Sequence, residues 1–248
     1  MDLNHKTCVV TGGSRGIGRA IAIEFASAGA NVVVNYQSSE RAAHSVVEAI
    51  DMETDGEAIT VQGDITDETA MESLRESAHH AFGPVDVLVN NAGITADRTF
   101  KNMTRSQWDE VIEVNLGGVF NCTQAFYTDL CNASEGRVIN ISSMVGLIGN
   151  YGQANYAAAK SGLLGFTRTL ALEVASSGTT VNCIAPGFVQ TDMLEQVPDD
   201  VQKDIIEQIP LERFASPEEI AGLARYLACS RSGYMTGQIV PITGGMEW

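Results

Sequence analysis

The sequence predicts an α/β protein built on one doubly wound, seven-stranded parallel sheet with helices on both faces. Short runs rich in Val and Ile alternate with longer helix-like segments along the whole chain. The short runs show no inside–outside alternation, which is typical of strands that are buried on both faces. No linker-like stretch or change of composition divides the 248 residues, so we expect a single domain over residues 1–248.

Seven strands are expected in order along the chain. They are Thr7–Thr11, Asn31–Tyr36, Ala58–Gln62, Val85–Asn90, Arg137–Ile141, Thr180–Ile184 and Gln238–Ile242. The segments between them that are most clearly helix-like are Arg19–Ala28, Asp67–Phe82, Arg105–Leu130 and Gln153–Ser176. This is the Rossmann-type arrangement, in which ligands bind beyond the carboxyl ends of the strands. Candidate functional residues are therefore those that directly follow a strand.

Composition limits the kinds of partner. The chain has 31 acidic and 15 basic residues, a formal charge of −16, with the acidic residues scattered rather than gathered in a tail. This disfavours nucleic-acid binding and is typical of surfaces that stay soluble in concentrated salt, so we expect a halophilic protein. No N-terminal targeting segment or membrane-spanning apolar run is recognisable, and five widely spaced cysteines indicate buried free thiols. We expect a cytoplasmic protein without a metal site.

A glycine-rich stretch follows the first expected strand. Glycine allows the backbone N–H groups at a helix N-terminus to approach a phosphate closely, so the stretch predicts a site for a dinucleotide pyrophosphate. A tight turn between strand and helix would also favour glycine. The expected contacts are Gly12, Ser14, Arg15, Gly16, Ile17 and Gly18.

The end of the second expected strand indicates which nucleotide binds. NAD-binding proteins usually place an acidic residue there for the ribose 2′-hydroxyl, whereas this chain has Asn35, Tyr36 and Gln37. Arg15 and Arg41 are placed to pair with a 2′-phosphate, although both would also be ordinary as solvated surface arginines. We therefore expect NADPH or NADP+ in preference to NADH.

Tyr156 and Lys160 stand four residues apart in a helix-like segment, so their side chains share one helix face. A cation about 4 Å from a tyrosine would lower the tyrosine pKa by about three units from its ordinary value near 10. This spacing by itself arises often by chance on surface helices. Support comes from Ser142 and Ser143, which follow the fifth expected strand, because Ser143 is placed to bind a carbonyl oxygen that Tyr156 protonates.

Asparagines mark two further positions. Asn90 and Asn91 close the fourth expected strand, ahead of Ala92 and Gly93. A structural use explains Asn90, whereas we expect Asn91 to contact the cofactor. Asn115 lies inside an expected helix, between apolar residues, where a polar side chain requires a reason.

These features together resemble the short-chain dehydrogenase/reductase family over essentially the whole chain. The matching motifs are Thr-Gly-x-x-x-Gly-x-Gly, Asn-Asn-Ala-Gly, Asn115, Ser143, Tyr156-x-x-x-Lys160 and Pro186-Gly187, in family order and spacing. The resemblance implies that Tyr156 is the acid and that Lys160 lowers its pKa and holds the nicotinamide ribose. Ser143 would orient the substrate, and Asn115 would support a proton-relay water. Further implied cofactor contacts are Asp64, Ile65, Ala92, Gly93, Pro186, Gly187, Val189 and Thr191.

Within that family, Gly149–Tyr156 and Pro186–Met193 look like the corresponding stretches of 3-oxoacyl thioester reductases. The stretch Gly93–Asp97 and the one from Phe100 to Asp109 are closer to acetoacetyl-CoA reductases of polyhydroxyalkanoate synthesis. The substrate contacts implied by this likeness are Asp97, Ser143, Gln153 and Phe188. A homotetramer is implied as well.

The acyl carrier is suggested by charge. Carrier-protein reductases often dock an acidic partner with basic residues at two places where this chain has Ser134 and Ser177. We therefore expect reduction of a short 3-oxoacyl-CoA such as acetoacetyl-CoA to the (R)-3-hydroxyacyl-CoA, with Arg98 or Lys101 near the coenzyme A phosphates. The alternatives are 3-oxoacyl chains on acyl carrier protein and an unrelated ketone. A dinucleotide sensor without catalysis would not need Ser143, Tyr156 and Lys160 together.

Overall fold

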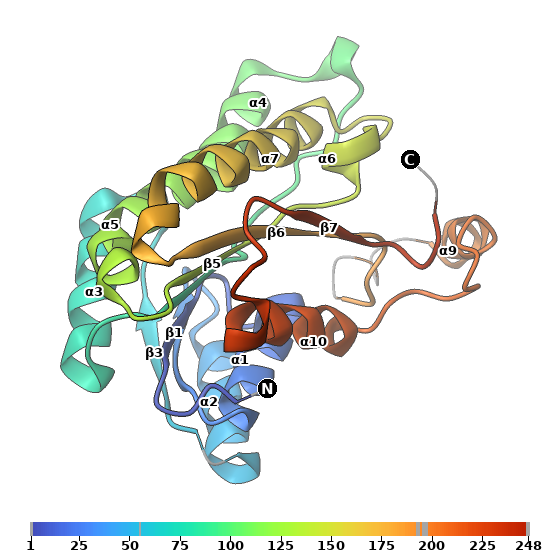
Figure 1. The fold of residues 1–248 in the computed structure, drawn as a ribbon. Coiled ribbons are helices and arrows are strands. Elements are labelled where there is room, and N and C mark those ends of the chain that lie inside the picture. Colours follow the sequence, from blue (N-terminus) through green and yellow to red (C-terminus); the bar gives the residue numbers. More distant parts are fainter. Residues whose placement is uncertain (1, 55, 192–193, 195–197, 247–248) are drawn as a thin grey trace.

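The computed structural model describes residues 2–54, 56–191, 194 and 198–246. Its strands form one sheet in the order β3-β2-β1-β4-β5-β6-β7, and each neighbouring pair is parallel (Figure 1). The strands are β1 (Thr7–Val10), β2 (Asn31–Tyr36), β3 (Ala58–Gln62), β4 (Val87–Asn90), β5 (Arg137–Ile141), β6 (Thr180–Pro186) and β7 (Ile239–Ile242). The predicted doubly wound, seven-stranded parallel sheet is confirmed.

Helices cover both faces of the sheet (Figure 1). One face carries α1 (Gly16–Ser27), α2 (Glu40–Glu53) and α10 (Pro217–Ala228). The other carries α3 (Glu68–Phe82), α5 (Gly118–Asn132) and α7 (Ala154–Val174), with α4 (Arg105–Ile112) beside α7. The shorter elements are η1 (Phe100–Asn102), η2 (Glu113–Gly117), α6 (Val145–Ile148), η3 (Ala175–Ser177), α9 (Asp199–Ile206) and η4 (Ser230–Ser232).

Strand side chains divide between two apolar layers, one on each face. In β2, Val32 and Val34 pack in the layer with α1, α2 and α10, whereas Val33 packs in the layer with α3, α5 and α7. Since both layers exclude water, apolar residues are needed at consecutive positions. The non-alternating runs in the sequence have this physical cause.

Several boundaries differ from the sequence prediction by one to three residues, and two differences bear on the site. Strand β6 continues to Pro186 because its last residues pair with β7, with Pro186 opposite Ile242. The helix predicted over Arg105–Leu130 is interrupted by η2, a π-helical turn that contains Asn115. Both differences arise from contacts with distant elements, which local sequence patterns do not report.

The structure also bears on the expectations from composition. All five cysteines are free thiols, and Cys8, Cys122, Cys183 and Cys229 are buried, as predicted, whereas Cys131 is half-buried. In the part of the chain that the structure describes, no helix combines the length and apolar character needed to cross a bilayer.

Candidate active site

The predicted site residues gather at the carboxyl edge of the sheet. Because the strands are parallel, the segments that follow β1, β4, β5 and β6 leave the sheet on the same side. Helix α7 lies against this group of strands and adds residues of its first two turns (Figure 1). The edge thus combines a glycine-rich loop on one side with Ser143, Tyr156 and Lys160 on the other.

The glycine-rich loop fits a dinucleotide phosphate. Gly16 has φ +52°, a left-handed conformation that favours glycine, and a Cβ at Gly18 would overlap the Gly12 carbonyl oxygen. Helix α1 begins in this loop, and its N-cap residue Arg15 accepts no side-chain hydrogen bond from the first N–H groups of the helix. Those N–H groups and the positive end of the helix dipole suit an anion. Thr191 reaches the loop from the segment after β6, with its Cγ2 3.2 Å from where a Cβ at Gly16 would lie.

Asn91 has a different use from the one predicted. Its Nδ2 donates to the carbonyl oxygens of Thr11 (2.9 Å) and Gly12 (3.1 Å). The Thr11 hydroxyl in turn accepts the N–H groups of Asn91 (3.0 Å) and Ala92 (3.1 Å). The side chain of Asn91 therefore fastens the phosphate loop to the end of β4 rather than pointing to a ligand.

Asn35 likewise turns into the fold. It is buried, its Nδ2 donates to the Gly63 carbonyl oxygen (3.0 Å), and its Oδ1 accepts the Gly12 N–H (3.4 Å). Tyr36 is also buried. Among the predicted residues at the end of β2, Gln37 is exposed, and its Nε2 donates to Asp64 Oδ2 (2.6 Å).

The side chain of Arg15 lies at the start of α2. The Arg15 guanidinium donates to the hydroxyl of Ser39, the N-cap residue of α2. A surface depression next to it is lined by Ser38, Ser39, Glu40, Arg41, Ala42 and Ser45. Two arginines, several hydroxyl groups and a helix N-terminus suit a phosphate group, so the residues present fit NADP better than NAD. Glu40 is the feature of this depression that opposes an anion.

Asp64 and Ile65 follow β3 at the same edge. Hydrogen bonds from the Thr66 N–H (2.9 Å), the Thr66 hydroxyl (2.8 Å) and Gln37 lower the pKa of the Asp64 carboxyl, which is therefore ionised. Ile65 is buried, and its carbonyl oxygen accepts a hydrogen bond from Asn121 (3.1 Å). Asp64 is thus the more accessible of these two predicted cofactor contacts.

Tyr156 and Lys160 extend from α7 towards the end of β5. The Ser142 hydroxyl donates to the Lys160 carbonyl oxygen (2.9 Å), and Lys160 Nζ donates to the Ile141 carbonyl oxygen (2.8 Å). These two bonds fix the helix against the strand end that carries Ser143. The buried Lys160 Nζ lies 5.6 Å from the centroid of the Tyr156 ring.

The pKa of Tyr156 is not lowered in the way that the sequence suggested. Although part of this side chain is accessible, burial of the phenol raises its pKa to about 12, which a hydrogen bond with Ser143 opposes and the charge of Asp97 reinforces. Burial also lowers the pKa of Lys160 to about 8. Burial is the largest cause of both shifts, because it disfavours the charged form of each group. In the chain by itself, Tyr156 is a protonated phenol, the form that can donate a proton.

Asn115 is fully buried and pairs with one backbone position. Its Nδ2 donates to the Ile94 carbonyl oxygen and its Oδ1 accepts the Ile94 N–H, both at 2.8 Å. This reciprocal pair holds the segment after β4 beside Lys160, whose Nζ lies 3.5 Å from where a Cβ at Gly93 would be. The structure gives the side chain a positioning role, and the relay water stays a prediction.

The predicted substrate residues Asp97 and Gln153 meet across two loops, where Gln153 Nε2 donates to Asp97 Oδ2 (2.8 Å). Asn155, which sequence reasoning missed, fixes the same junction by donating to the carbonyl oxygens of Ala96 (3.2 Å) and Gln107 (3.0 Å). Its one signal in the sequence was a polar residue next to Tyr156. Phe188 packs against Phe214, with ring centroids 6.3 Å apart, and no contact shown places it with the other substrate residues.

The segment after β6 is anchored to the strand ends. The Pro186 carbonyl oxygen accepts the Met144 N–H (2.8 Å), and the Gly187 N–H donates to the Ile242 carbonyl oxygen (2.9 Å). Val189 is buried and pairs with Ala215. Asp192 and Met193, which contributed to the family resemblance, lie outside the described residues.

The predicted structural role of Asn90 is confirmed. Its Nδ2 donates to Asn140 Oδ1 (2.9 Å) and Thr123 Oγ1 (3.2 Å), and Asn140 Nδ2 donates to Thr167 Oγ1 (2.9 Å). This buried network joins β4 and β5 to α5 and α7, so it sets the depth at which α7 lies beneath the site.

Comparison with known proteins agrees with this geometry. The sequence model of the family described as short chain dehydrogenase matches residues 6–202. The chain belongs to the short chain dehydrogenase family. It is therefore an oxidoreductase of the short chain dehydrogenase type.

Several similar proteins are named 3-oxoacyl-[acyl-carrier-protein] reductase. A 3-oxoacyl-[acyl-carrier-protein] reductase of Staphylococcus epidermidis is 44% identical over 242 residues, which cover 98% of this chain and 99% of that protein. The enzyme of that name from a Synechocystis species is 46% identical over 245 residues, 98% of each chain. One from Staphylococcus aureus is 43% identical over 241 residues, covering 97% of this chain and 98% of that one.

Proposed function

We propose that this chain is an NADPH-dependent reductase of 3-oxoacyl thioesters. The observation that carries the proposal is the contact of the protonated Tyr156 with Ser143 at the end of β5, beside a glycine-rich loop suited to a dinucleotide. The names of the similar proteins support the 3-oxoacyl part. Arg15 and the serine-rich depression at the start of α2 support NADPH.

The residues of the chain have separate tasks in this reaction. When bound, NADPH supplies the hydride. Ser143 orients the 3-carbonyl oxygen, and Tyr156 transfers its phenolic proton to that oxygen as negative charge develops there. Donors aimed at a developing oxyanion are often worth about 3 to 4 kcal/mol each. Lys160, with a pKa of about 8, lies behind the tyrosine, where we propose that it holds the nicotinamide ribose.

For the acyl carrier, the similar proteins favour the alternative that the sequence analysis ranked second. All three are named for acyl-carrier-protein substrates and match this chain over nearly its whole length. We therefore propose 3-oxoacyl chains on acyl carrier protein as the principal substrate. Coenzyme A thioesters are the second candidate, because a chain of charge −16 with serines at positions 134 and 177 is poorly suited to an acidic protein partner.

A direct test follows the oxidation of NADPH with acetoacetyl thioesters of acyl carrier protein and of coenzyme A. We expect kcat/KM to be at least about tenfold higher for the carrier-protein substrate, and at least about tenfold higher with NADPH than with NADH. The reverse order of the two thioesters would establish the coenzyme A alternative. Absence of NADPH oxidation with both would contradict the proposal as a whole.

We also propose that the protein is a homotetramer suited to concentrated salt. Exposed apolar side chains on α5 and α7, among them Phe120 (54% exposed) and Leu172 (81% exposed), support an interface between copies. The charge of −16 supports the salt requirement, because at about 1 M salt the Debye length falls to about 3 Å and repulsion is screened. Light scattering in dilute buffer and in molar KCl tests the two proposals. A monomer would contradict the homotetramer. A protein that loses stability as KCl is added would contradict the salt requirement.

A further inference from the structure

In the described part of the chain, some basic side chains lie in ion pairs with acidic ones, and those near the substrate residues do not. Elsewhere, Lys6 is held by Asp86, Arg75 by Glu72, Arg137 by Glu135 and Arg213 by Glu219. Arg98 and Lys101, between β4 and α4, are exposed and lie in no ion pair with a described residue. In a chain of charge −16, two open cations on one loop form a local site for an anion.

The loop that carries these cations is fixed to the entrance of the catalytic helix. The Arg98 N–H donates to the Gly152 carbonyl oxygen (2.8 Å), and the preceding Asp97 accepts the hydrogen bond from Gln153 (2.8 Å). Asp97 also lies close enough to Tyr156 for its charge to act on the phenol. Arg98 therefore follows directly on a residue whose charge acts on the Tyr156 phenol.

Apolar side chains accompany the cations. Phe100, between Arg98 and Lys101, is 78% exposed, and Tyr151, next to Gly152, is 88% exposed. In Figure 1 the loop before α4 and the loop after α6 lie at the same end of the molecule. Exposed aromatic side chains beside unpaired cations mark a surface for a ligand with both apolar and anionic parts.

We infer that Arg98 and Lys101 bind the phosphate of a phosphopantetheine arm, with Phe100 and Tyr151 along its neutral portion. Arg98 and Lys101 flank Phe100 closely along the chain, and the backbone bond from Arg98 to Gly152 joins them to the turn that carries Tyr151. Coenzyme A and acyl carrier protein share this arm, so one subsite serves either. The inference rests on the proposed function and adds where the carrier end of the substrate lies.

The test compares thioesters that differ in the phosphate. Acetoacetyl-pantetheine lacks it, acetoacetyl-4′-phosphopantetheine has it, and coenzyme A and acyl carrier protein present the same arm with further groups. The double variant Arg98→Gln/Lys101→Gln keeps the backbone bond to Gly152. We expect its ratio of kcat/KM for the phosphopantetheine thioester over the pantetheine thioester to fall about tenfold, through KM, because two charge-assisted phosphate contacts are lost.

A matched control is Arg231→Gln, an exposed arginine on η4 that forms no ion pair within the described residues. This variant should keep the wild-type ratio of kcat/KM for the phosphopantetheine thioester over the pantetheine thioester. In the wild type, molar KCl should reduce that ratio, because salt screens the charges. The double variant could lose kcat/KM with the coenzyme A thioester but not with the acyl-carrier-protein thioester. This result would support the subsite and assign it to free coenzyme A.

Two outcomes would overturn the inference. One is an equal fall for both thioesters in the double variant, which would show a loss of structure or arm packing rather than of phosphate binding. The other is a wild-type enzyme that has equal kcat/KM for the phosphopantetheine thioester and the pantetheine thioester. Failure of the wild type to reduce any thioester would refute the proposed function itself, which makes the two kinds of failure distinguishable.

Discussion

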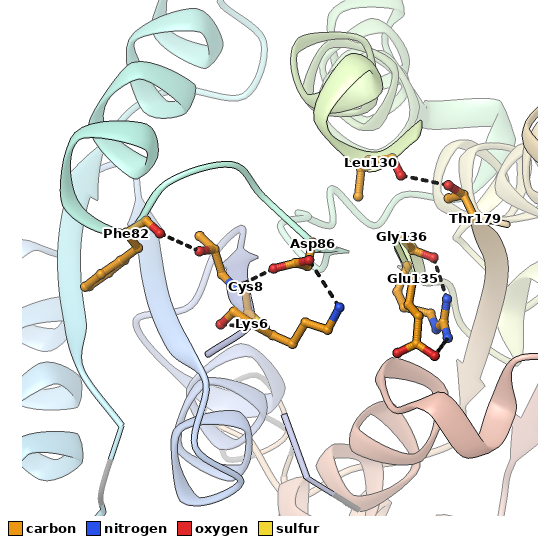
Figure 2. Close-up of polar contacts among 10 residues, drawn as sticks. Lys6, Cys8, Phe82, Asp86, Leu130, Glu135, Gly136 and Thr179 are labelled. Carbon is orange, nitrogen blue, oxygen red and sulfur yellow. Dashed lines mark hydrogen bonds and ion pairs between the residues drawn. The ribbon is translucent and has the colours of Figure 1, made fainter. Parts of the chain in front are cut away.

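At the amino edge of the sheet, polar side chains pair with one another, whereas at the carboxyl edge several are left open. Asp86 accepts hydrogen bonds from Lys6 Nζ (3.2 Å) and from the Thr7 N–H (3.0 Å), as Figure 2 shows. On the opposite edge, Arg98 and Lys101 have no acidic partner among the described residues. Among the described residues, side chains of the same types are thus paired at one end of the strands and unpaired at the other.

The amino edge also closes its loops through backbone acceptors. The Thr179 hydroxyl donates to the Leu130 carbonyl oxygen (2.8 Å), the Thr7 hydroxyl to that of Phe82 (3.1 Å), and Arg137 Nη1 to that of Gly136 (2.9 Å) (Figure 2). Burial lowers the pKa of the Arg137 guanidinium, opposed by Glu135. These contacts satisfy groups that would otherwise be costly to bury, so this edge contributes to stability.

The carboxyl edge keeps its buried polar bonds beneath the surface. Asn91, Asn115 and Asn155 hold the loops in place, whereas Ser143 and Tyr156 contact each other and Arg15 contacts Ser39. The comparison teaches that this edge separates positioning groups from reacting groups. Substitutions at the two edges should therefore affect different measurements.

The largest effect is expected for Tyr156→Phe. Removing the proton donor should lower kcat for acetoacetyl thioesters by about 10²- to 10⁴-fold, since that is the usual contribution of a general acid. NADPH binding, measured by fluorescence titration, should persist. The control Tyr234→Phe alters a fully exposed tyrosine and should keep wild-type kcat. If Tyr156→Phe retained most of the wild-type kcat, Tyr156 would not be the general acid.

At the opposite edge, Asp86→Ala should affect stability instead. It leaves the Thr7 N–H and Lys6 without their acceptor, so we expect the free energy of unfolding in urea to fall by about 2 kcal/mol. kcat/KM below the unfolding transition should stay at the wild-type value. Glu110→Ala, at an exposed position on α4, serves as the control for loss of a carboxylate. A loss of activity without a loss of stability would contradict the division between the edges.

A smaller effect is expected for Arg15→Gln. Loss of the guanidinium beside Ser39 should lower kcat/KM for NADPH about tenfold, because a charge-assisted phosphate contact is removed, while kcat/KM for NADH changes little. Steady-state assays with both coenzymes give the ratio. An equal fall for both coenzymes would place Arg15 at the pyrophosphate or in the fold instead.

The smallest effect is expected for Asp97→Asn. The charge of Asp97 helps to raise the pKa of Tyr156, so its removal should lower that pKa. Reduction requires the protonated phenol, and the alkaline limb of the kcat/KM profile should move to lower pH by less than about one unit. Asp97→Glu keeps the charge and should retain the wild-type limb. A shift to higher pH in Asp97→Asn would show that the carboxylate acts in another way.

The sequence by itself determined the number of strands, their order along the chain and the positions of the candidate catalytic residues. Strands buried on both faces need continuous apolar runs, and in a parallel sheet the residues after each run reach one edge, so Ser143 and the glycine-rich loop could be placed there. Tyr156 and Lys160 followed from helix geometry, since four residues make about one turn. All of these depend on spacing within a short segment.

Only the tertiary structure decided what the asparagines do and how Tyr156 titrates. Asn91 and Asn115 bond to backbone groups 79 to 80 and 21 residues away along the chain, and no local pattern specifies such partners. The pKa of Tyr156 rises because burial outweighs the hydrogen bond with Ser143, and burial is a property of the whole packed molecule. Whether a cation such as Arg98 meets a carboxylate is likewise settled by folding, because pairing depends on positions in space.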